Sequence, residues 1–376
     1  MKKKIVHILK GKANPNTLNG VNKVVHSLAT KQFAMGHDVE VWGVTATPSK
    51  IPHKHAYALK LFKAKKLRFT IDESLIAAIK TLPKNTVAHL HSVFLPELFT
   101  VARQLEQAGI PWVISPHGGY ASESLKKNKT IKKIYMYLFE KKLINSSMGI
   151  HALGYYGEAE YFSASRNMNK TVIIPNGHEV SDLQKESYAT SLPLKLVYCG
   201  RIAIPQKGLD VLLRAIFICL KKGISVTLDL IGDGVDIKEL KKLAATLEIE
   251  SCVTFHGAKT GLDKDLLLMS SDVFVHTSRW DGIPMAALEA MALGLPAIVT
   301  QATNIGEEVS EHEAGYVSSY VDPENISHQI GLAYRDKTSG LIEKKGKAAR
   351  KMVTDYFSWS TIAKRMDSEL YGGVKC

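Results

Sequence analysis

The stretch Ser278-Arg-Trp-Asp-Gly-Ile-Pro-Met-Ala-Ala-Leu-Glu-Ala-Met-Ala-Leu-Gly-Leu-Pro296 decides the fold of this 376-residue chain. It predicts a turn followed by an alanine- and methionine-rich helix, which Gly294 and Pro296 end. A β-branched strand, Ala297–Thr300, comes next. A helix that leads directly into a buried strand is typical of a parallel sheet covered by helices.

The start of this helix is a candidate anion site. Pro284 suits the first helical position, where no backbone N–H is needed. Amides at a helix start lack internal partners, so Gly282–Met285 can present N–H groups to an anion. Asp281 lies just before the helix and Glu289 two turns inside it, so both can face one ligand. The competing interpretation makes Asp281 a plain N-cap and Glu289 an exposed acid.

Short apolar strands alternate with amphipathic helices along the whole chain. Strands are expected at Lys4–Leu9, Asp38–Val44, Val87–Leu90, Trp112–Ser115, Gly149–Leu153, Val172–Ile174, Lys195–Cys199, Val226–Ile231, Val253–His256, Val273–Thr277 and Ala297–Thr300. Helices are expected at Val21–Met35, Leu98–Ala108, Gly208–Lys221, Ile237–Leu247, Asp263–Ser270 and Met285–Leu293.

This alternation, found twice, predicts an α/β protein of two Rossmann-like, doubly wound domains that face a cleft. The expected domains are residues 1–180 and 190–356, joined by the turn-rich segment Pro175–Pro193. In such sheets, ligands bind beyond the carboxyl ends of the strands.

Composition favours a cytoplasmic protein. The basic start is followed by a short apolar run, Ile5–Leu9, which predicts a first strand rather than a secretion signal. No apolar run is long enough to span a bilayer. The four cysteines, Cys199, Cys219, Cys252 and Cys376, have no C-x-x-C spacing and are expected to be reduced thiols.

The net positive charge belongs to the first half of the chain. Residues 1–190 hold 27 basic and 13 acidic side chains, whereas residues 191–376 hold 22 and 23. A basic half beside a neutral one implies an anionic partner: nucleic acid, a phospholipid surface or a phosphorylated substrate.

Several motifs in register carry a family resemblance. In the second half they are Cys199-Gly-Arg201 with Lys207-Gly208, then Gly232-Asp-Gly234, Val253–Gly257, and the pair Asp281 and Glu289 at a spacing of acid-x7-acid. In the first half they are Asn19-Gly20-Val21, Ser115-Pro-His117-Gly-Gly119 and Ile174-Pro-Asn-Gly177. Together they resemble the GT4 family ("glycosyl transferases group 1") of retaining GT-B glycosyltransferases, from about Lys4 to a final helix at residues 357–376. That helix is expected to cross back and brace the first domain. The family usually has Glu where this chain has Asp281.

The resemblance implies transfer of a sugar from a UDP- or GDP-linked donor. Arg201 and Lys207 lie between a strand and a helix, where both can neutralise the charge of a diphosphate leaving group. Their alternative is two solvated charges. Gly20 opens another helix and could bring backbone close to the same phosphates, or it could form a simple turn.

The remaining site residues follow from the resemblance. Glu289 should accept hydrogen bonds from the ribose, and Asp281 with the backbone of Gly282, Ile283, Pro284 and Met285 should hold the donor sugar. His117, followed by two glycines, should lie beside the same sugar. His91, which ends a strand, is a candidate on the acceptor side. Arg279, Trp280 and His256 are candidate contacts to the base.

The reaction should retain anomeric configuration without a metal or other cofactor. Front-face displacement, in which the leaving phosphate takes the acceptor's proton, is favoured over a covalent intermediate on Asp281. Asp263-Lys-Asp265 resembles a metal-binding Asp-x-Asp motif, but acids at a helix start also interact favourably with its dipole, and Arg201 with Lys207 would replace a cation.

Two basic and apolar segments suit an anionic membrane surface. Residues 126–144 combine seven lysines with Ile131, Ile134 and Leu138, and residues 60–68 surround apolar side chains with further basic ones. Alternatively, the first segment is a solvated helix that packs Ile131, Ile134 and Leu138 into the core. The expected location is the cytoplasm, with peripheral attachment to the inner face of the membrane.

The expected acceptor is a glycan or a polyprenyl-diphosphate-linked saccharide, in bacterial polysaccharide or lipopolysaccharide synthesis. A nucleotide-sugar epimerase of the same fold is the alternative enzyme, and it would need no acceptor. A nucleic-acid-binding protein is not expected, because the phosphate-suited groups lie in the neutral half and no nucleic-acid-binding motif is present. A dinucleotide enzyme lacks its glycine fingerprint here.

Overall fold

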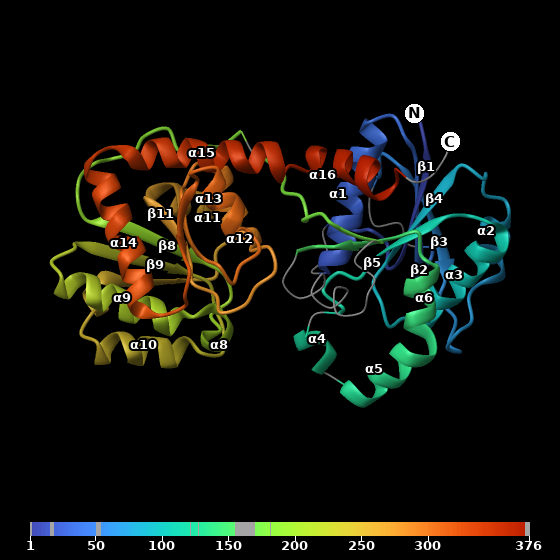
Figure 1. Cartoon of the computed structure of the whole chain (residues 1–376), viewed down its shortest axis with the longest axis horizontal. Helices are drawn as coiled ribbons and strands as arrows, with labels where there is room; N and C mark the ends of the chain where they lie inside the picture. Colours follow the sequence, from blue (N-terminus) through green and yellow to red (C-terminus); the bar gives the residue numbers. More distant parts are fainter. Residues whose placement is uncertain are drawn as a thin grey trace. The chain divides into compact units, whose positions relative to one another are not determined.

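The structure is a computed structural model that describes residues 2–15, 19–49, 54–120, 122–126, 128–154, 170–180 and 182–372. It divides into two compact units. Unit 1 comprises Met1–Gly177 and Trp359–Cys376, and unit 2 comprises His178–Ser358. Each is built on one parallel sheet (Figure 1), so the predicted pair of doubly wound α/β domains is confirmed.

The sheet of unit 1 has seven parallel strands in the order β3-β2-β1-β4-β5-β6-β7. Their bounds are β1 Lys4–Lys10, β2 Asp38–Thr45, β3 Ala58–Lys63, β4 Thr86–His91, β5 Trp112–Ser115, β6 Gly149–Ala152 and β7 Thr171–Ile173. The helices are α1 Gly20–Ala34, α2 Glu73–Lys80, α3 Pro96–Ala108, α4 Ser122–Lys126, α5 Lys129–Tyr135, α6 Lys141–Ser146 and α16 Trp359–Arg365. π-helical turns follow α5 (Met136–Glu140) and α16 (Met366–Leu370).

Alternation along the strands divides the side chains of unit 1 between two faces. Val6, Ile8, Ala88 and Leu90 pack toward α2 and α3. The residues between them, such as Ile5 and Val87, pack toward α1 and α16. This second face is unusual because His7, His89, His91, Ser115 and His151 also belong to it, and all five are buried.

The C-terminal segment is part of unit 1 and lies beside α1 (Figure 1). Ile362, Met366 and Leu370 pack against Leu28 of α1 and against the sheet. Lys3 Nζ lies 2.8 Å from Asp367 Oδ1 and donates to the carbonyl of Tyr371 at 3.3 Å. The C-terminal segment therefore covers one face of the sheet whose first strand, β1, is formed by the N-terminal residues.

The sheet of unit 2 has six parallel strands in the order β10-β9-β8-β11-β12-β13. Their bounds are β8 Leu194–Cys199, β9 Val226–Ile231, β10 Val253–Gly257, β11 Val273–His276, β12 Ala297–Thr300 and β13 Gly315–Ser318. The helices are α8 Ile204–Lys207, α9 Leu209–Lys221, α10 Ile237–Thr246, α11 Gly261–Ser270, α12 Met285–Ala292, α13 Gly306–Glu311, α14 Pro323–Thr338 and α15 Leu341–Tyr356. A 3-10 turn, Glu250–Cys252, precedes β10.

Helices cover both faces of this sheet. α9, α10 and α14 bury Leu212, Leu240 and Ile330 on one face, and α12 and α15 bury Leu288 and Met352 on the other. Most of the segment expected as a linker belongs to unit 2, which begins at His178. Within it, the amide of Lys185 donates to Leu293 O at 2.7 Å, and Tyr188 Oη donates to Gly294 O at 2.6 Å.

Close backbone contacts fix the carboxyl ends of β8 and β9. Gly200 (φ +155°) and Gly232 (φ +144°) follow these strands, and a Cβ on Gly232 would lie 1.9 Å from Gly200 O. A Cβ on Gly234 would lie 2.0 Å from Ile202 O. Only glycine fits at either position, so the loops after the two strands interlock.

Two strands were not predicted. β3 and β13 are edge strands, and β3 contains Lys60 and Lys63, which were interpreted as part of a basic surface segment. Lys60 Nζ lies 2.8 Å from Glu40 Oε2 and over the ring of Trp42, so its charge is compensated within the sheet. Among the described residues, no helix combines the length and hydropathy needed to cross a bilayer. Cys199, Cys219 and Cys252 are free, and Cys376 lies outside the described residues.

Candidate functional site

A polar cluster lies at the carboxyl ends of β8 and β11 in unit 2. Lys207 ends the single turn of α8, and its Nζ forms an ion pair with Asp281 Oδ2. His276, the last residue of β11, places Nε2 2.8 Å from the same oxygen. Ser278 Oγ lies 2.9 Å from His276 Nε2. The sequence predicted Lys207 and Asp281 for this site and not His276, which is 2% exposed.

Asp281 is held as a carboxylate. Burial alone would raise its pKa, but hydrogen bonds and charge from His276 and Lys207 hold the pKa at about 2. Because a carboxylate only accepts, His276 Nε2 carries the proton of that contact. His276 Nδ1 is buried and has no partner among the described residues. Burial lowers the pKa of His276, while the Asp281 carboxylate raises it.

The helix that follows does not use Asp281 as its N-cap. α12 begins at Met285, and Pro284 is its N-cap. The sequence predicted Pro284 at the first helical position, so the helix begins one residue later than expected. The amide of Gly282 donates to Asp281 Oδ1 at 3.0 Å, so it is not available to a ligand. The amides of Ile283 and Met285 have no hydrogen-bond acceptor among the described residues, and they remain open to an anion.

The loop after β8 places Arg201 at the surface. Arg201 Nη2 donates to Gln206 Oε1 at 2.6 Å, while its own carbonyl accepts from Tyr198 Oη at 2.8 Å. The backbone carbonyl of Gln206 also accepts a hydrogen bond from the backbone amide of Arg279 at 2.8 Å. The guanidinium of Arg201 is therefore held by a neutral amide and not by a carboxylate. Its positive charge stays available to bind a phosphate.

Glu289 and the Asp-x-Asp motif lie on neighbouring helices. Glu289 Oε2 of α12 lies 2.7 Å from Lys264 Nζ of α11, and Asp265 Oδ1 lies 3.7 Å from the same ammonium. Asp263 lies in the first turn of α11, where a negative charge suits the helix dipole. The carboxylates of Asp265 and Glu289 thus share one lysine.

Two of the three candidate base contacts are committed to other partners. Arg279 forms a bidentate pair with Asp210 at 2.9 and 2.7 Å. His256 Nε2 lies 2.6 Å from Asp229 Oδ1. Trp280 is exposed, and its backbone carbonyl accepts from Gln206 Nε2 at 3.5 Å.

His117 of unit 1 has the left-handed backbone that a turn after β5 requires, with φ +52°. Its Nε2 lies 2.9 Å from His91 Nδ1. His91 in turn places Nε2 2.9 Å from His7 Nδ1. His91 is 1% exposed, so it does not offer the direct contact to the acceptor substrate that was expected. Its connection to the surface is the hydrogen bond to His117.

These contacts belong to one continuous chain of hydrogen bonds. His7 Nε2 lies 2.6 Å from Gln32 Oε1, and Gln32 Nε2 lies 3.4 Å from Tyr371 Oη. Tyr371 Oη lies 2.7 Å from His89 Nδ1. The far end runs through the following contacts: His89 Nε2 to Ser115 Oγ at 2.6 Å, Ser115 Oγ to His151 Nδ1 at 2.6 Å, and His151 Nε2 to Ile174 O at 2.7 Å.

The carbonyl of Ile174 fixes the direction of every bond in this histidine chain. A carbonyl only accepts, so His151 Nε2 carries a proton and its Nδ1 accepts from Ser115. Burial lowers the pKa of His151 to about 4, of His7 to about 4 and of His117 to about 3, so these imidazoles are neutral. Each ring therefore has one N–H that donates and one nitrogen that can only accept, and every hydrogen bond along the chain points the same way. At the far end, His117 Nε2 donates to His91, and His117 Nδ1 keeps a free lone pair.

His7, His89 and His91 also present ring nitrogens within 4.8 Å of one another, an arrangement that a metal could use. All six of their ring nitrogens, however, take part in the hydrogen bonds just described. A metal would have to replace these bonds, and the donor set is therefore better suited to the histidine chain than to an ion.

Gly20 is the first residue of α1, and a Cβ there would meet no atom of the described residues within 4 Å. The side chain of Asn19 caps the helix by accepting from the amides of Val21 and Asn22 at 3.0 and 3.3 Å. These two amides are thus occupied.

Sequence reasoning missed His276, Gln206 and the histidine chain. An isolated histidine at the end of an apolar strand has no distinguishing pattern, although its place five residues before Asp281 put it at the same edge of the sheet. The histidine chain depends on which strands are neighbours: His7 and His89 share a register position only because β1 pairs with β4. Periodicity alone does not give that order.

Comparison with known proteins gives consistent results. Residues 18–182 match the family model "Glycosyltransferase Family 4", and residues 181–352 match "Glycosyl transferases group 1". The chain is 25% identical over 314 residues to the Escherichia coli UDP-Gal:alpha-D-GlcNAc-diphosphoundecaprenol alpha-1,3-galactosyltransferase, covering 78% of this chain and 77% of that protein.

Solved structures share the fold over nearly the whole chain. Anabaena HepE in complex with UDP is 18% identical with a TM-score of 0.70, covering 98% of this chain and 100% of that one. The lipopolysaccharide outer core galactosyltransferase WaaB, in its apo form, is 16% identical with a TM-score of 0.69, covering 98% and 99%. With two adjoining family models that together run from residue 18 to 352, this chain belongs to the GT4 family of GT-B-fold glycosyltransferases.

Proposed function

We propose that this glycosyltransferase transfers a sugar from a UDP-linked donor, with retention of configuration and without a metal, to a lipid-linked saccharide in bacterial surface polysaccharide assembly. The observation that carries the donor assignment is the ion pair between Lys207 and Asp281 beside the open amides of Ile283 and Met285. Positive charge and free N–H groups at one point are what a diphosphate requires.

Charge on the leaving diphosphate is the main barrier to breaking the glycosidic bond, and fixed cations lower it. Arg201 supplies a planar fork whose side-chain partner, among the described residues, is the neutral amide of Gln206. Lys207 supplies a point charge held in place by Asp281. On this account Arg201 and Lys207 do the work that a divalent cation does in other phosphate sites.

Front-face displacement accounts for retention better than a covalent intermediate on Asp281. Both oxygens of Asp281 accept hydrogen bonds, from Lys207 and His276 on one side and from the Gly282 amide on the other. Ser278 Oγ adds a longer contact to this carboxylate at 3.4 Å. A carboxylate with a pKa of about 2 and four donors is a poor nucleophile. The leaving phosphate oxygen would take the proton of the acceptor hydroxyl as the new bond forms and the old one breaks.

His117 is proposed to bind a substrate hydroxyl. Its Nδ1 lone pair can only accept, so it would receive a hydrogen bond from the sugar. Glu289 would hold the ribose hydroxyls once Lys264 shares or releases it.

Two names among the relatives support the substrate classes. The Escherichia coli relative is named for a UDP-galactose donor and a diphosphoundecaprenol-linked acceptor, and the Anabaena structure contains UDP. The family comparisons are with transferases, so they do not favour the epimerase alternative.

A donor panel tests the proposal. UDP-, GDP- and ADP-sugars are compared by thermal shift and by release of nucleotide, with and without a polyprenyl-diphosphate-linked saccharide. We expect a UDP-sugar to raise the melting temperature most, and nucleotide release to increase when the acceptor is present. Release that does not depend on any acceptor, together with isomerised donor, would instead identify an epimerase.

A further inference from the structure

A pocket in unit 1 of about 650 Å³ is not used by the donor site. Lys10, Val44 and Lys63 line it from the carboxyl ends of β1, β2 and β3, and Leu95 lines it from the loop after β4. α5 closes it from the other side through Ile131 and its neighbours. The volume is that of a small-molecule site, and the carboxyl ends of parallel strands are where such sites form.

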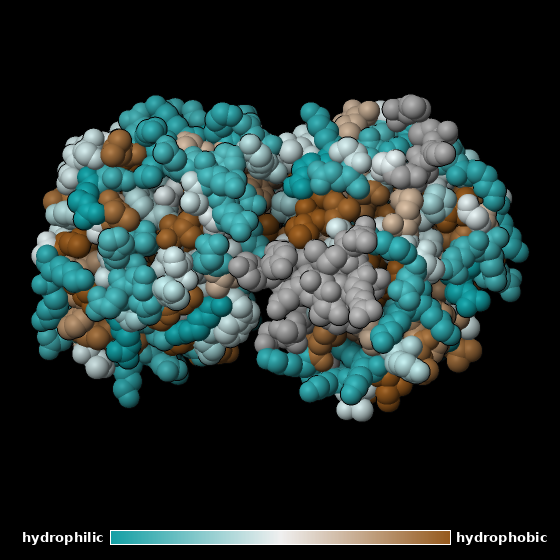
Figure 2. Space-filling view, in the orientation of Figure 1, coloured by the Kyte–Doolittle hydropathy of each residue, from teal (hydrophilic) through white to brown (hydrophobic). Residues whose placement is uncertain are grey.

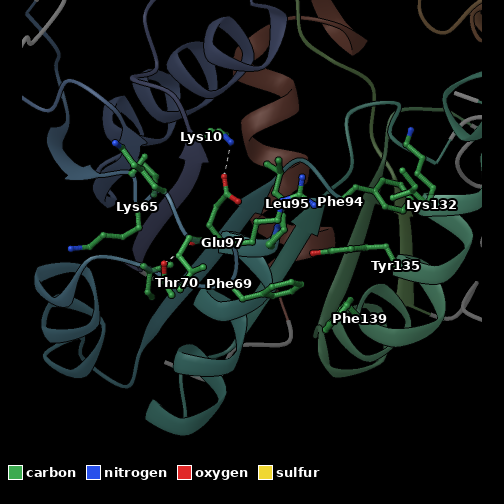
Figure 3. A pocket seen from close by; sticks show the side chains of 18 of the residues that line it. Lys10, Lys65, Phe69, Thr70, Phe94, Leu95, Glu97, Lys132, Tyr135 and Phe139 are labelled. Atoms are coloured by element: carbon green, nitrogen blue, oxygen red, sulfur yellow. Dashed lines mark hydrogen bonds and ion pairs between the residues drawn. The ribbon is translucent and has the colours of Figure 1, made fainter. Parts of the chain in front are cut away.

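One wall of this pocket is aromatic. Phe69 packs on Phe139 with ring centroids 4.6 Å apart, and Tyr135 lies 5.0 Å from Phe139 and 6.0 Å from Phe94. Figure 3 shows Tyr135 reaching from α5 across the pocket toward Leu95 and Glu97. Aliphatic side chains complete the wall, so it suits a branched hydrocarbon.

Polar groups at the pocket are positively charged and largely uncompensated. Six basic residues and one acid line it. The acid, Glu97, is paired with Lys10 at 2.8 Å (Figure 3). Lys65 is paired with Asp72 at 3.1 Å. The other four lining cations have no acidic partner among the described residues; they are Lys63, Lys66, Arg68 and Lys132. These four side chains can therefore attract an anion to this surface.

The pocket also contains features that are costly without a ligand. The hydroxyl of Tyr135 is shielded from solvent and has no hydrogen-bond partner among the described residues. Phe69 and Phe94 have left-handed backbones, with φ +62° and +57°, which is strained for an aromatic residue. Thr100 Oγ1 donates to Phe69 O at 2.9 Å, and the Phe94 amide donates to Glu140 Oε1 at 2.7 Å, so both conformations are fixed.

The apolar surface continues beyond the pocket. Ile131, Ile134 and Leu138 are 68%, 56% and 46% exposed, so the interpretation that packs them into the core is wrong. Hydrophobic and hydrophilic side chains lie side by side over α5 on the face that Figure 2 shows. A hydrocarbon chain longer than the pocket can thus leave it along an apolar rim. Lys127 of this segment lies outside the described residues.

We propose that this pocket, called the lipid pocket below, binds the head of an isoprenoid diphosphate. The diphosphate lies against Lys63, Lys66, Arg68 and Lys132 and accepts a hydrogen bond from Tyr135, and the first isoprene units pack on the aromatic wall. This inference rests on the proposed function, because the isoprenoid diphosphate would be the carrier of the acceptor saccharide. It adds the residues that recognise the carrier.

A nucleotide fits the lipid pocket less well. Reading a base requires donors and acceptors at its edge, but besides the Tyr135 hydroxyl the uncharged polar side chains of the described lining are only Thr70 and Asn128. Thr70 Oγ1 already donates to Leu67 O at 2.6 Å. The exposed rim of isoleucine and leucine offers apolar contacts, which a nucleotide cannot use. An isoprenoid chain can bury its hydrocarbon against them.

The test uses the full chain and calorimetric titration with farnesyl diphosphate, compared with farnesol and with inorganic diphosphate. We expect farnesyl diphosphate to bind about tenfold or more tightly than either half-molecule. The double variant Lys66→Glu/Arg68→Glu should weaken that binding by about tenfold or more. Tyr135→Phe keeps the packing and should weaken farnesyl diphosphate several-fold without changing farnesol.

The matched control is Lys80→Glu/Lys364→Glu, which makes the same change in net charge at exposed helix positions of unit 1. It should leave farnesyl diphosphate binding unchanged. Equal weakening by both double variants, equal affinity for farnesyl diphosphate and inorganic diphosphate, or an effect of Lys66→Glu/Arg68→Glu on phosphatidylglycerol vesicles but not on farnesyl diphosphate would each overturn the proposal.

UDP binding is measured in parallel on every variant to separate the two proposals. Retained UDP binding with no binding of farnesyl diphosphate overturns the lipid pocket and leaves the proposed donor site standing. Binding of farnesyl diphosphate without UDP binding does the reverse.

Discussion

His91 Nδ1 lies 2.9 Å from His117 Nε2, and this hydrogen bond joins a candidate substrate-binding imidazole to a buried polar chain that ends at the carbonyl of Ile174. Because that carbonyl cannot donate, the direction of each bond is set and His117 is left with its proton on Nε2. A residue more than fifty positions away in the sequence therefore determines which nitrogen of His117 can meet a ligand.

The first prediction concerns this tautomer. In protein labelled with ¹⁵N-histidine, His117 should show an unprotonated Nδ1 and a protonated Nε2 at neutral pH, because Nε2 donates to His91. His91→Phe removes the acceptor and should let His117 populate the other tautomer, with the signal assigned by its loss in His117→Gln. A protonated Nδ1 in the unmodified protein would contradict the polarity of the histidine chain.

The second prediction concerns acid stability. Burial lowers the folded-state pKa of His7 and His151 to about 4, below the ordinary value of 6.5. Between pH 6.5 and about 4 the unfolded chain binds more protons than the folded one, so the free energy of unfolding should fall as pH falls through this window. Each buried imidazole contributes up to about 1.4 kcal/mol per pH unit there.

Urea unfolding followed by tryptophan fluorescence measures this slope, since Trp42 and Trp112 are buried in unit 1. His151→Gln can keep both hydrogen bonds and cannot titrate, so its slope between pH 4 and 6.5 should be smaller. The exposed control His328→Gln should leave the slope unchanged. The pKa of Asp281 is lowered to about 2, so the stability that its carboxylate adds is lost only below about pH 4. The loss expected from His7 and His151 falls above that pH.

The fold was largely predictable because buried parallel strands are continuous apolar runs, and eleven strands were located close to their observed bounds. The edge strand β3 was not, since its lysines alternate with apolar residues and resemble a basic surface segment. Lys207, Asp281 and Arg201 were predicted from spacing and resemblance. His276, Gln206 and the histidine chain were not, because they act through neighbours that only the strand order brings together.

The third prediction concerns Asp281, where the family usually has Glu. Its short side chain accepts from Lys207, His276 and the Gly282 amide. Asp281→Asn removes the charge that fixes Lys207 and should lower turnover by about ten- to a hundredfold, with about 1–3 kcal/mol lost from the free energy of unfolding. Asp281→Glu should retain the charge and lose less of both.

This variant also addresses mechanism. If the reaction is a front-face displacement, mass spectrometry of enzyme incubated with donor should detect no sugar on residue 281, and Asp281→Asn should keep measurable activity. A glycosyl-enzyme trapped on Asp281, with activity abolished in Asp281→Asn, would establish the covalent route instead.

The fourth prediction concerns metals. Because Arg201 and Lys207 are proposed to neutralise the diphosphate, enzyme treated with EDTA should keep its turnover within about twofold. Added magnesium should have no effect on the treated enzyme. Turnover that disappears in EDTA and returns with magnesium would show that a divalent ion is required.

The most direct measurement is donor turnover by Arg201→Ala and by Lys207→Ala, beside Lys238→Ala, which removes an exposed lysine of α10. We expect Arg201→Ala and Lys207→Ala each to lose about a hundredfold or more in kcat, because one group that stabilises a leaving charge is removed, while Lys238→Ala keeps normal turnover. Unchanged turnover in both Arg201→Ala and Lys207→Ala would contradict this expectation.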